Sequence, residues 1–213
     1  MSTSDRGYAL GHTDRERRRL SLQARFLNPL TEDFFLRAGI RQGMRVLDLG
    51  CGVGEVSVLA SRLVGPGGSV TGIDIDESAL EIARERARAE GLSQAAFERS
   101  DLLAFAAEPP FHAVVGRLIL LHTAHPAAVI RHAISLLAPG GIVAFQEGPF
   151  TRAALGGVAR PEWDRTVDAI NASMTRLCKH RAVGLQLWRL LSEAGIVDIQ
   201  SRGELAWRDR PTA

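Results

Sequence analysis

The sequence predicts a single α/β domain built around a mostly parallel sheet. From Met44 onward, apolar runs of strand length alternate with amphipathic helical segments, and a glycine-rich turn follows the first run. The 213 residues suffice for one ordinary domain, and 46% hydrophobic with 23% charged residues is typical of globular chains. Helices are therefore expected on both faces of the sheet.

Two helices are expected before the first strand. The first begins with a capping box at Thr13 and should end at Asn28 and Pro29, because proline interrupts a helix. A second short helix should cover residues 31–39. Residues 1–40 would then form an amino-terminal helical cap.

Strands and helices should alternate regularly over residues 44–147, the expected binding core. The expected strands are residues 44–49, 69–74, 95–100, 112–121 and 142–147. The expected helices between them are residues 55–64, 77–90 and 126–137, the last of which is broken by a Pro-Gly-Gly run.

The rhythm changes after the fifth strand. Residues 148–183 read as an insertion above the sheet, with a glycine-rich loop and a helix that begins at Pro161. Residues 184–213 should contain a helix over 185–194 and a sixth strand over 196–201. All these parts are expected to belong to one domain spanning residues 1–213.

Charge and cysteine content exclude several classes of protein. The formal net charge is only +2, from 26 basic and 24 acidic residues, so no nucleic-acid partner is expected. Cys51 and Cys178 lie far apart without metal-ligand spacing, so neither a disulfide framework nor a metal site is expected. We find no signal peptide and no apolar run of membrane-span length, and we expect a cytoplasmic protein without a membrane partner.

The turn after the first strand reads VLDLGCGVG over residues 46–54. Ligands of open parallel sheets bind at the carboxyl ends of the strands, and glycine lets the backbone approach a ligand closely. Gly50, Gly52 and Gly54 therefore indicate a cofactor cradle, and the following helix presents free N–H groups to an anionic moiety.

Two carboxylates follow neighbouring strands. Asp74 comes twenty residues after Gly54 at the end of the second strand, where a carboxylate can accept hydrogen bonds from ribose hydroxyls. Asp101 follows the third strand at the same edge of the sheet. These positions together predict a site for an adenosine-sized ligand.

The glycine spacing differs from the dinucleotide fingerprint, because G-C-G-V-G-E places the third glycine one residue early. The sequence resembles instead the class I S-adenosylmethionine-dependent methyltransferases over residues 44–147. The resemblance lies in VLDLGCGVG, GIDID, SDLL and LLAPGG, and LWRLLSEAGIVDIQ extends it toward the carboxyl terminus.

The resemblance implies a Rossmann-like, doubly wound sheet with strand order 3-2-1-4-5-7-6. The family's seventh strand forms a hairpin with the sixth, and here the only candidate is residues 204–207. We therefore expect the seventh strand to be short or missing, which would expose a sheet edge.

The resemblance also implies that S-adenosylmethionine is the cofactor and which residues contact it. Asp48 would hold its amino group directly or through water, Asp74 its ribose, and Ile75 one adenine face. The remaining implied contacts are Gly50, Cys51 and Gly52 at the methionine part, Asp101 and Leu102 at the adenine edge, and Arg117 chiefly through its backbone.

In similar enzymes, amino-terminal extensions fold over the cofactor. Tyr8 would then touch the cofactor or the acceptor. The other interpretation is that these helices make only surface contacts.

A base near the transfer axis would help an acceptor hydroxyl lose its proton. His122 and His125 after the fourth strand and Glu147 at the end of the fifth are the candidates, with His122 and Glu147 preferred. His122 has an alternative role as a hydrogen-bonding partner of the loop backbone, and His125 as a residue at a helix start.

We expect methyl transfer to a small organic acceptor, at an oxygen, nitrogen or carbon nucleophile of a secondary metabolite or quinone-like compound. Two alternatives stay open: an NAD(P)-dependent oxidoreductase, against which the glycine spacing argues, and a protein that binds S-adenosylmethionine without turnover. The sequence leaves the oligomeric state open.

Overall fold

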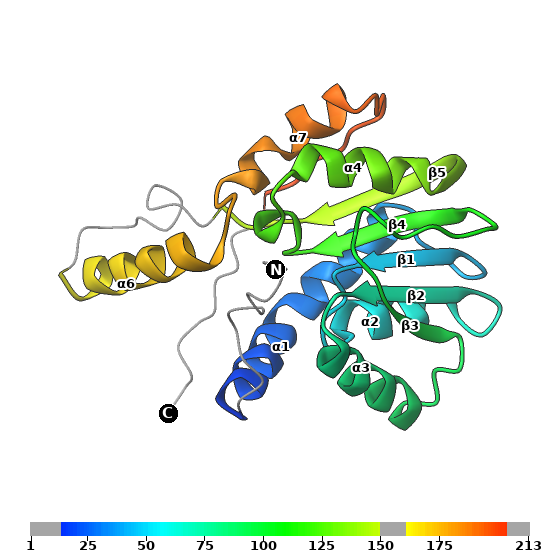
Figure 1. Cartoon of the computed structure of the whole chain (residues 1–213), viewed down its shortest axis with the longest axis horizontal. Helices are drawn as coiled ribbons and strands as arrows, with labels where there is room; N and C mark the ends of the chain where they lie inside the picture. Colours follow the sequence, from blue (N-terminus) through cyan, green and yellow to red (C-terminus); the bar gives the residue numbers. More distant parts are fainter. Residues whose placement is uncertain (1–13, 150–160, 204–213) are drawn as a thin grey trace, which may run out of the picture.

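The structure is a computed structural model, and it describes residues 14–149 and 161–203. Its centre is a five-stranded parallel sheet in the order β3-β2-β1-β4-β5 (Figure 1). The strands are β1 Arg45–Leu49, β2 Ser69–Asp74, β3 Ala95–Arg99, β4 Phe111–Arg117 and β5 Leu137–Gln146. The five expected core strands and the 3-2-1-4-5 part of the expected order are confirmed.

Helices cover both faces of this sheet, as expected for parallel crossovers (Figure 1). On one face lie α1 (Asp14–Arg37), α2 (Glu55–Val64) and α3 (Glu77–Ala89), and on the other lie α4 (Pro126–Ser135) and α7 (Val183–Glu193). The short η1 (Leu120–His122) follows β4, and α6 (Pro161–Leu177) lies beyond the carboxyl ends of the strands.

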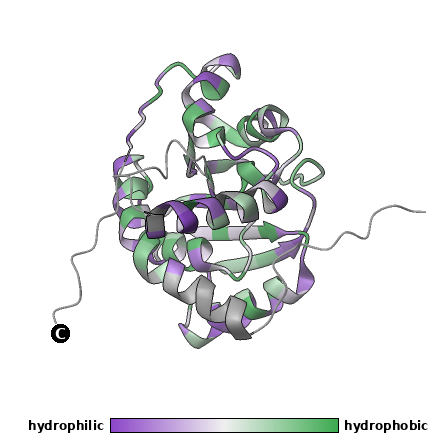
Figure 2. Ribbon diagram, turned by 90° about the vertical axis from the view of Figure 1, so that its left-hand side faces the viewer, coloured by the Kyte–Doolittle hydropathy of each residue, from purple (hydrophilic) through white to green (hydrophobic). Residues whose placement is uncertain are grey.

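Each face of the sheet has its own hydrophobic core, because neighbouring residues of a strand point to opposite sides. Val46 of β1 belongs to one core cluster with Phe35 of α1 and residues of α2, whereas Leu47 belongs to the other, with Ile130 of α4 and residues of α7. Figure 2 shows the hydrophilic residues spread over the covering helices, with more hydrophobic strands between them. The sheet is thus packed against helices on both faces.

The first helix differs from expectation. Residues 14–37 form one continuous helix with Pro29 inside it, so the expected end at Asn28 and Pro29 is wrong. Proline removes one backbone hydrogen bond, but tertiary contacts on both sides of it outweigh this loss. Phe35 is fully buried after the proline, and Asn28 and Thr31 are hydrogen-bonded to Arg117 of β4.

The fifth strand is longer than expected. It begins at Leu137 rather than Ile142, and the Pro-Gly-Gly run lies inside it as an irregularity in the pairing with β4. Phe111 pairs with Leu137 and Ala113 with Ile142, so extra residues of β5 bulge out between these pairs. The preceding helix accordingly ends at Ser135.

The expected sixth strand is wrong for the described residues. α7 ends at Glu193, Gly195 follows with a positive φ of 90°, and residues 196–201 form no strand. In the expected order the sixth strand pairs with the seventh and not with the fifth, and the candidate seventh strand at 204–207 lies outside the described residues. Without that neighbour in the described sheet, residues 196–201 have no ladder to join.

Within the described ranges, no helix combines the length and apolar character that crossing a bilayer requires.

Candidate functional site

The glycine-rich turn joins β1 to α2 in left-handed backbone conformations. Gly50, Gly52 and Gly54 have φ values of 64°, 51° and 81°. A Cβ on Gly50 would lie 2.2 Å from Cδ1 of Ile119, whereas one on Gly52 would meet no atom within 4 Å. Gly50 therefore permits close packing, and Gly52 faces open space in which a ligand fits.

The carboxylate of Asp74 fastens this turn to the end of β2. Its Oδ2 accepts a hydrogen bond from the Gly52 backbone N–H at 2.9 Å, and its Oδ1 accepts one from the Asp76 N–H at 3.0 Å. Asp74 is half-buried, at the rim of the space above Gly52. The two residues expected to bind a ribose and to admit the cofactor are therefore side by side.

Asp48 lies beneath the turn. It is 1% exposed, and its Oδ2 accepts a hydrogen bond from the Ser57 hydroxyl at 2.6 Å. Burial raises the pKa of Asp48 to about 7, although Ser57 and the charge of Arg117 oppose the rise. Because so little of Asp48 is exposed, the geometry favours contact with an amino group through water over direct contact.

The expected adenine side lies on the loops after β2 and β3. Ile75 is 55% exposed, so it presents an apolar surface that a flat ring can cover. Asp101 is exposed, and its Oδ1 accepts a hydrogen bond from the Leu103 N–H at 2.8 Å. Leu102 is half-buried against the core.

Arg117 ends β4 and reaches across to α1. Its Nη1 donates to Oδ1 of Asn28 at 2.9 Å and to Oγ1 of Thr31 at 3.0 Å. The buried Thr31 hydroxyl donates in turn to Oε1 of Gln146 at 2.6 Å. Leu118 directly after Arg117 has a φ of 54°, so the chain turns sharply here in a strained conformation.

Glu147 holds the loop after β4. Its Oε1 accepts hydrogen bonds from the backbone N–H groups of Ile119 at 2.9 Å and Leu120 at 2.8 Å. In the described part of the chain, its Oε2 is buried without a hydrogen-bond partner. Burial raises the pKa of Glu147 to about 7, against the lowering effect of these N–H groups.

The two candidate histidines occupy different environments. His122 is half-buried at the end of η1, whose first residues are bound by Glu147, and its backbone N–H donates to the Ile119 carbonyl oxygen at 3.0 Å. His125 is exposed at the residue that precedes α4. Glu147 therefore binds the backbone of the segment that ends at His122.

The remaining sequence candidates contribute less. Cys51 is buried, and burial raises the pKa of its thiol, so the group is neutral and suits packing rather than nucleophilic chemistry. Tyr8 lies outside the described residues. Among residues 14–149 and 161–203, no group of three or more His, Cys, Asp or Glu side chains is placed to hold a metal ion.

Sequence reasoning missed four polar residues around Arg117 and Asp48. They are Asn28, Thr31, Ser57 and Gln146. The signal for Thr31 and Ser57 was their place on the apolar side of a helix, where a small hydroxyl usually has a partner. No pattern in the sequence pointed to Asn28 or Gln146, because their partner comes from a different element.

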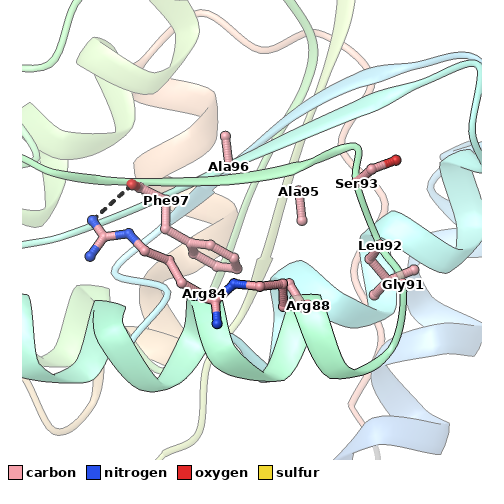
Figure 3. Close-up of a pocket in the computed structure, with 9 residues that line it drawn as sticks. Arg84, Arg88, Gly91, Leu92, Ser93, Ala95, Ala96 and Phe97 are labelled. Atoms are coloured by element: carbon pink, nitrogen blue, oxygen red, sulfur yellow. Dashed lines mark hydrogen bonds between the residues drawn. The ribbon is translucent and has the colours of Figure 1, made fainter.

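A hollow between α3 and β3 is lined by Arg84, Arg88 and Phe97, among others (Figure 3). Arg84 is already bonded there, since its Nη2 donates to the Phe97 carbonyl oxygen at 3.0 Å. The hollow extends to the turn at Gly91, which leads into the amino end of β3. It is therefore away from the carboxyl edge, where ligands of such sheets bind.

A family model described as a methyltransferase domain matches residues 40–193. The ubiquinone biosynthesis O-methyltransferase of Nitrosococcus oceani is 36% identical over 123 residues, which cover 56% of this chain and 50% of that protein. The methyltransferase GfsG of Streptomyces halstedii is 31% identical over 120 residues, which cover 55% of this chain and 42% of that protein. The chain thus spans about half the length of the curated relatives it matches.

Solved structures agree with the fold. A SAM-dependent methyltransferase from Aquifex aeolicus superposes with a TM-score of 0.59 at 19% identity, covering 78% of this chain and 79% of that one. At this identity the likeness establishes the architecture of the sheet and its helices.

Proposed function

This chain belongs to the methyltransferase domain family, in its class I with S-adenosylmethionine as methyl donor, and from that premise we propose that it methylates a small organic acceptor. The observation that carries the proposal is the open space above Gly52, bordered by the carboxylate of Asp74. The exposed Ile75 beside it offers an apolar surface for the adenine. These residues fit the adenosyl part of the donor.

The acceptor is proposed to be a hydroxylated compound, either quinone-like or a secondary metabolite. The name of one relative, the ubiquinone biosynthesis O-methyltransferase, supports an oxygen acceptor of this class. The small net charge of +2 also favours a small molecule over a nucleic acid. A cytoplasmic location stays a prediction of the sequence.

The bound donor would supply a methyl carbon attached to a positively charged sulfur, so that an acceptor oxygen could bond to this carbon as the carbon–sulfur bond breaks and S-adenosylhomocysteine leaves. The protein then has to align the acceptor and exclude water. We propose His122 as the base that takes the acceptor's hydroxyl proton. Glu147 would act in the same step by holding η1, because its Oε1 binds the backbone of Ile119 and Leu120.

Donor binding is tested first, by calorimetry with S-adenosylhomocysteine and with NAD. Binding of S-adenosylhomocysteine alone is expected, since the glycine turn lacks the dinucleotide spacing. Binding of NAD alone would make the chain an oxidoreductase of similar fold and refute the proposal.

Methyl transfer is tested with donor carrying an isotopic label in its methyl group and a panel of phenols, catechols and hydroxylated quinones. Labelled product from at least one acceptor is expected, and His122→Ala should lower its rate of formation without changing S-adenosylhomocysteine affinity. Donor binding without product from the panel or from host metabolite extract would favour a non-catalytic binding protein.

A further inference from the structure

Arg117 has more hydrogen-bonding capacity than its contacts use. In residues 14–149 and 161–203, both side-chain hydrogen bonds of Arg117 use Nη1, toward Asn28 and Thr31. A guanidinium has five N–H donors in a planar fork, so Nη2 and Nε are left for another acceptor. The side chain is half-buried, and burial lowers the pKa of Arg117. A half-buried cation of this kind is stabilised by an anionic partner.

The acidic residues that interact with Arg117 lie near the carboxyl edge of the sheet, where the cofactor is proposed to bind. Asp48 and Glu55 both oppose the lowering of the Arg117 pKa through their negative charges. Asp48 in turn experiences the charges of Arg117 and Asp74. Asp48 and Arg117 are therefore close enough for their charges to interact at the carboxyl end of the two central strands, β1 and β4.

The methionine end of S-adenosylmethionine carries an ammonium and a carboxylate. Asp48 offers the negative charge that the ammonium requires. The acidic residues of the site cannot bind the cofactor's carboxylate, because like charges repel. Arginine binds carboxylates with two parallel hydrogen bonds, which makes it the suitable partner. We infer that the guanidinium of Arg117, rather than its backbone alone, binds the carboxylate of the cofactor.

This role links the cofactor to α1. Nη1 keeps its bonds to Asn28 and Thr31 while Nη2 and Nε bind the carboxylate, so one side chain joins the helix to the ligand. Thr31 continues the link to Gln146 at the end of β5, and Asn28 donates to Oε2 of Glu55 at the start of α2 at 3.3 Å. Cofactor binding should therefore hold α1 more firmly against the sheet.

The inference rests on the proposed function, and a matched ligand pair tests it separately. S-Adenosylmethionine and its decarboxylated analogue differ only in the carboxylate. Arg117→Met should weaken binding of S-adenosylmethionine about 10- to 100-fold, the range for a lost charge-assisted pair. Affinity for the decarboxylated analogue should stay unchanged or rise, because a cation near its ammonium has been removed.

Arg62→Met is the matched control, since it removes an equal charge from an exposed side chain that is paired with Glu90 and lies in the last turn of α2, away from the glycine turn. It should change neither affinity. Equal losses for both ligands in Arg117→Met would overturn the inference and make Arg117 a purely structural residue. If the wild-type protein binds neither ligand, the proposed function itself fails.

Arg117→Lys provides the same measurement if Arg117→Met does not fold. Lysine keeps the charge but not the fork, so an intermediate loss for S-adenosylmethionine alone is expected. Hydrogen exchange gives a second readout. Amides of residues 14–37 should gain more protection from S-adenosylmethionine than from the decarboxylated analogue, and equal protection would contradict the link to α1.

Discussion

Gly50 and Gly52 lie in the same turn, but the structure requires each for a different reason. Both have positive φ, which glycine adopts without strain. Gly50 also lies against Ile119, so a side chain there would collide with the loop after β4. Gly52 has open space in front of it, so a side chain there would enter the proposed ligand position instead.

Gly52→Ala should therefore reduce ligand affinity much more than stability. The left-handed conformation costs an alanine about 1–2 kcal/mol of folding free energy, while the added methyl group should weaken S-adenosylhomocysteine binding at least tenfold. Gly43→Ala is the control, because Gly43 also has a positive φ and open space but precedes β1 at the opposite edge. Equal affinity of the two variants, measured by calorimetry, would contradict a ligand position above Gly52.

The buried carboxylate of Glu147 makes stability depend on pH. Its pKa is about 7 in the folded protein against an ordinary value of 4.5, so the folded state retains the proton at higher pH than the unfolded chain. Its contribution to stability is therefore greatest below about pH 4.5, falls as pH rises to about 7, and is constant above that.

Glu147→Gln should remove this dependence, because glutamine keeps an oxygen for the N–H groups of Ile119 and Leu120 but does not titrate. Urea unfolding at pH 5 and pH 8 measures the effect. From pH 5 to pH 8, the free energy of unfolding of the variant should rise by about 3 kcal/mol relative to that of the wild type. Asp48 titrates in both proteins, so its effect cancels from the difference between their free energies of unfolding. A difference that is the same at pH 5 and pH 8 would argue against a raised pKa at Glu147.

At the scale of elements, α1 shows how tertiary contacts override a local signal. The helix continues through Pro29 because residues on both sides of it make tertiary contacts. Arg117 donates hydrogen bonds to Asn28 and Thr31, and Phe35 packs in the hydrophobic core. The same contacts set the position of α1 against the carboxyl ends of β4 and β5. A break at Pro29 would release the residues that Arg117 binds.

Pro29→Ala tests the continuity of α1. Pro29 is exposed, so the substitution should disturb no packing and should restore a backbone N–H to the helix. The greater freedom of the unfolded chain offsets part of the gain. We expect the free energy of unfolding to rise by about 1–2 kcal/mol in urea titrations, whereas a helix that ended at Asn28 would give no gain.

At the scale of the whole molecule, the site depends on elements far apart in the sequence. The turn after β1, the ends of β2 and β4, and α1 meet at one edge because the order β3-β2-β1-β4-β5 places β1 between β2 and β4. A ligand bound there contacts several parts of the fold together. Its binding energy should therefore stabilise the folded chain as a unit.

S-Adenosylhomocysteine at 100 times its dissociation constant should add about 2.7 kcal/mol to stability. For a chain of this size that corresponds to a rise in Tm of about 5–10 °C, measured by calorimetric scanning. Asp74→Asn retains the size of the side chain but removes the charge, and should lose most of the rise. A full rise in this variant would exclude Asp74 from ribose binding.

Local patterns in the sequence were sufficient to predict the five core strands, the glycine turn and the carboxylates after β2 and β3. Apolar periodicity reports burial, and glycine spacing reports backbone conformation, and both are properties of neighbouring residues. The proximity of Asp74 to Gly52 was also foreseeable, because parallel strands end at one edge.

The tertiary structure alone decided the course of α1, the bulge in β5 and the absence of a strand over residues 196–201. It also decided the hydrogen-bond partners of two residues. Arg117 binds Thr31 and Asn28, which lie 86 and 89 residues before it, and Glu147 binds Leu120 and Ile119, which lie 27 and 28 residues before it. A hydrogen bond depends on where two side chains come to lie, and that position follows from the packing of whole elements. The sequence therefore determined which chemical groups stand at the edge of the sheet, and folding determined which of them meet.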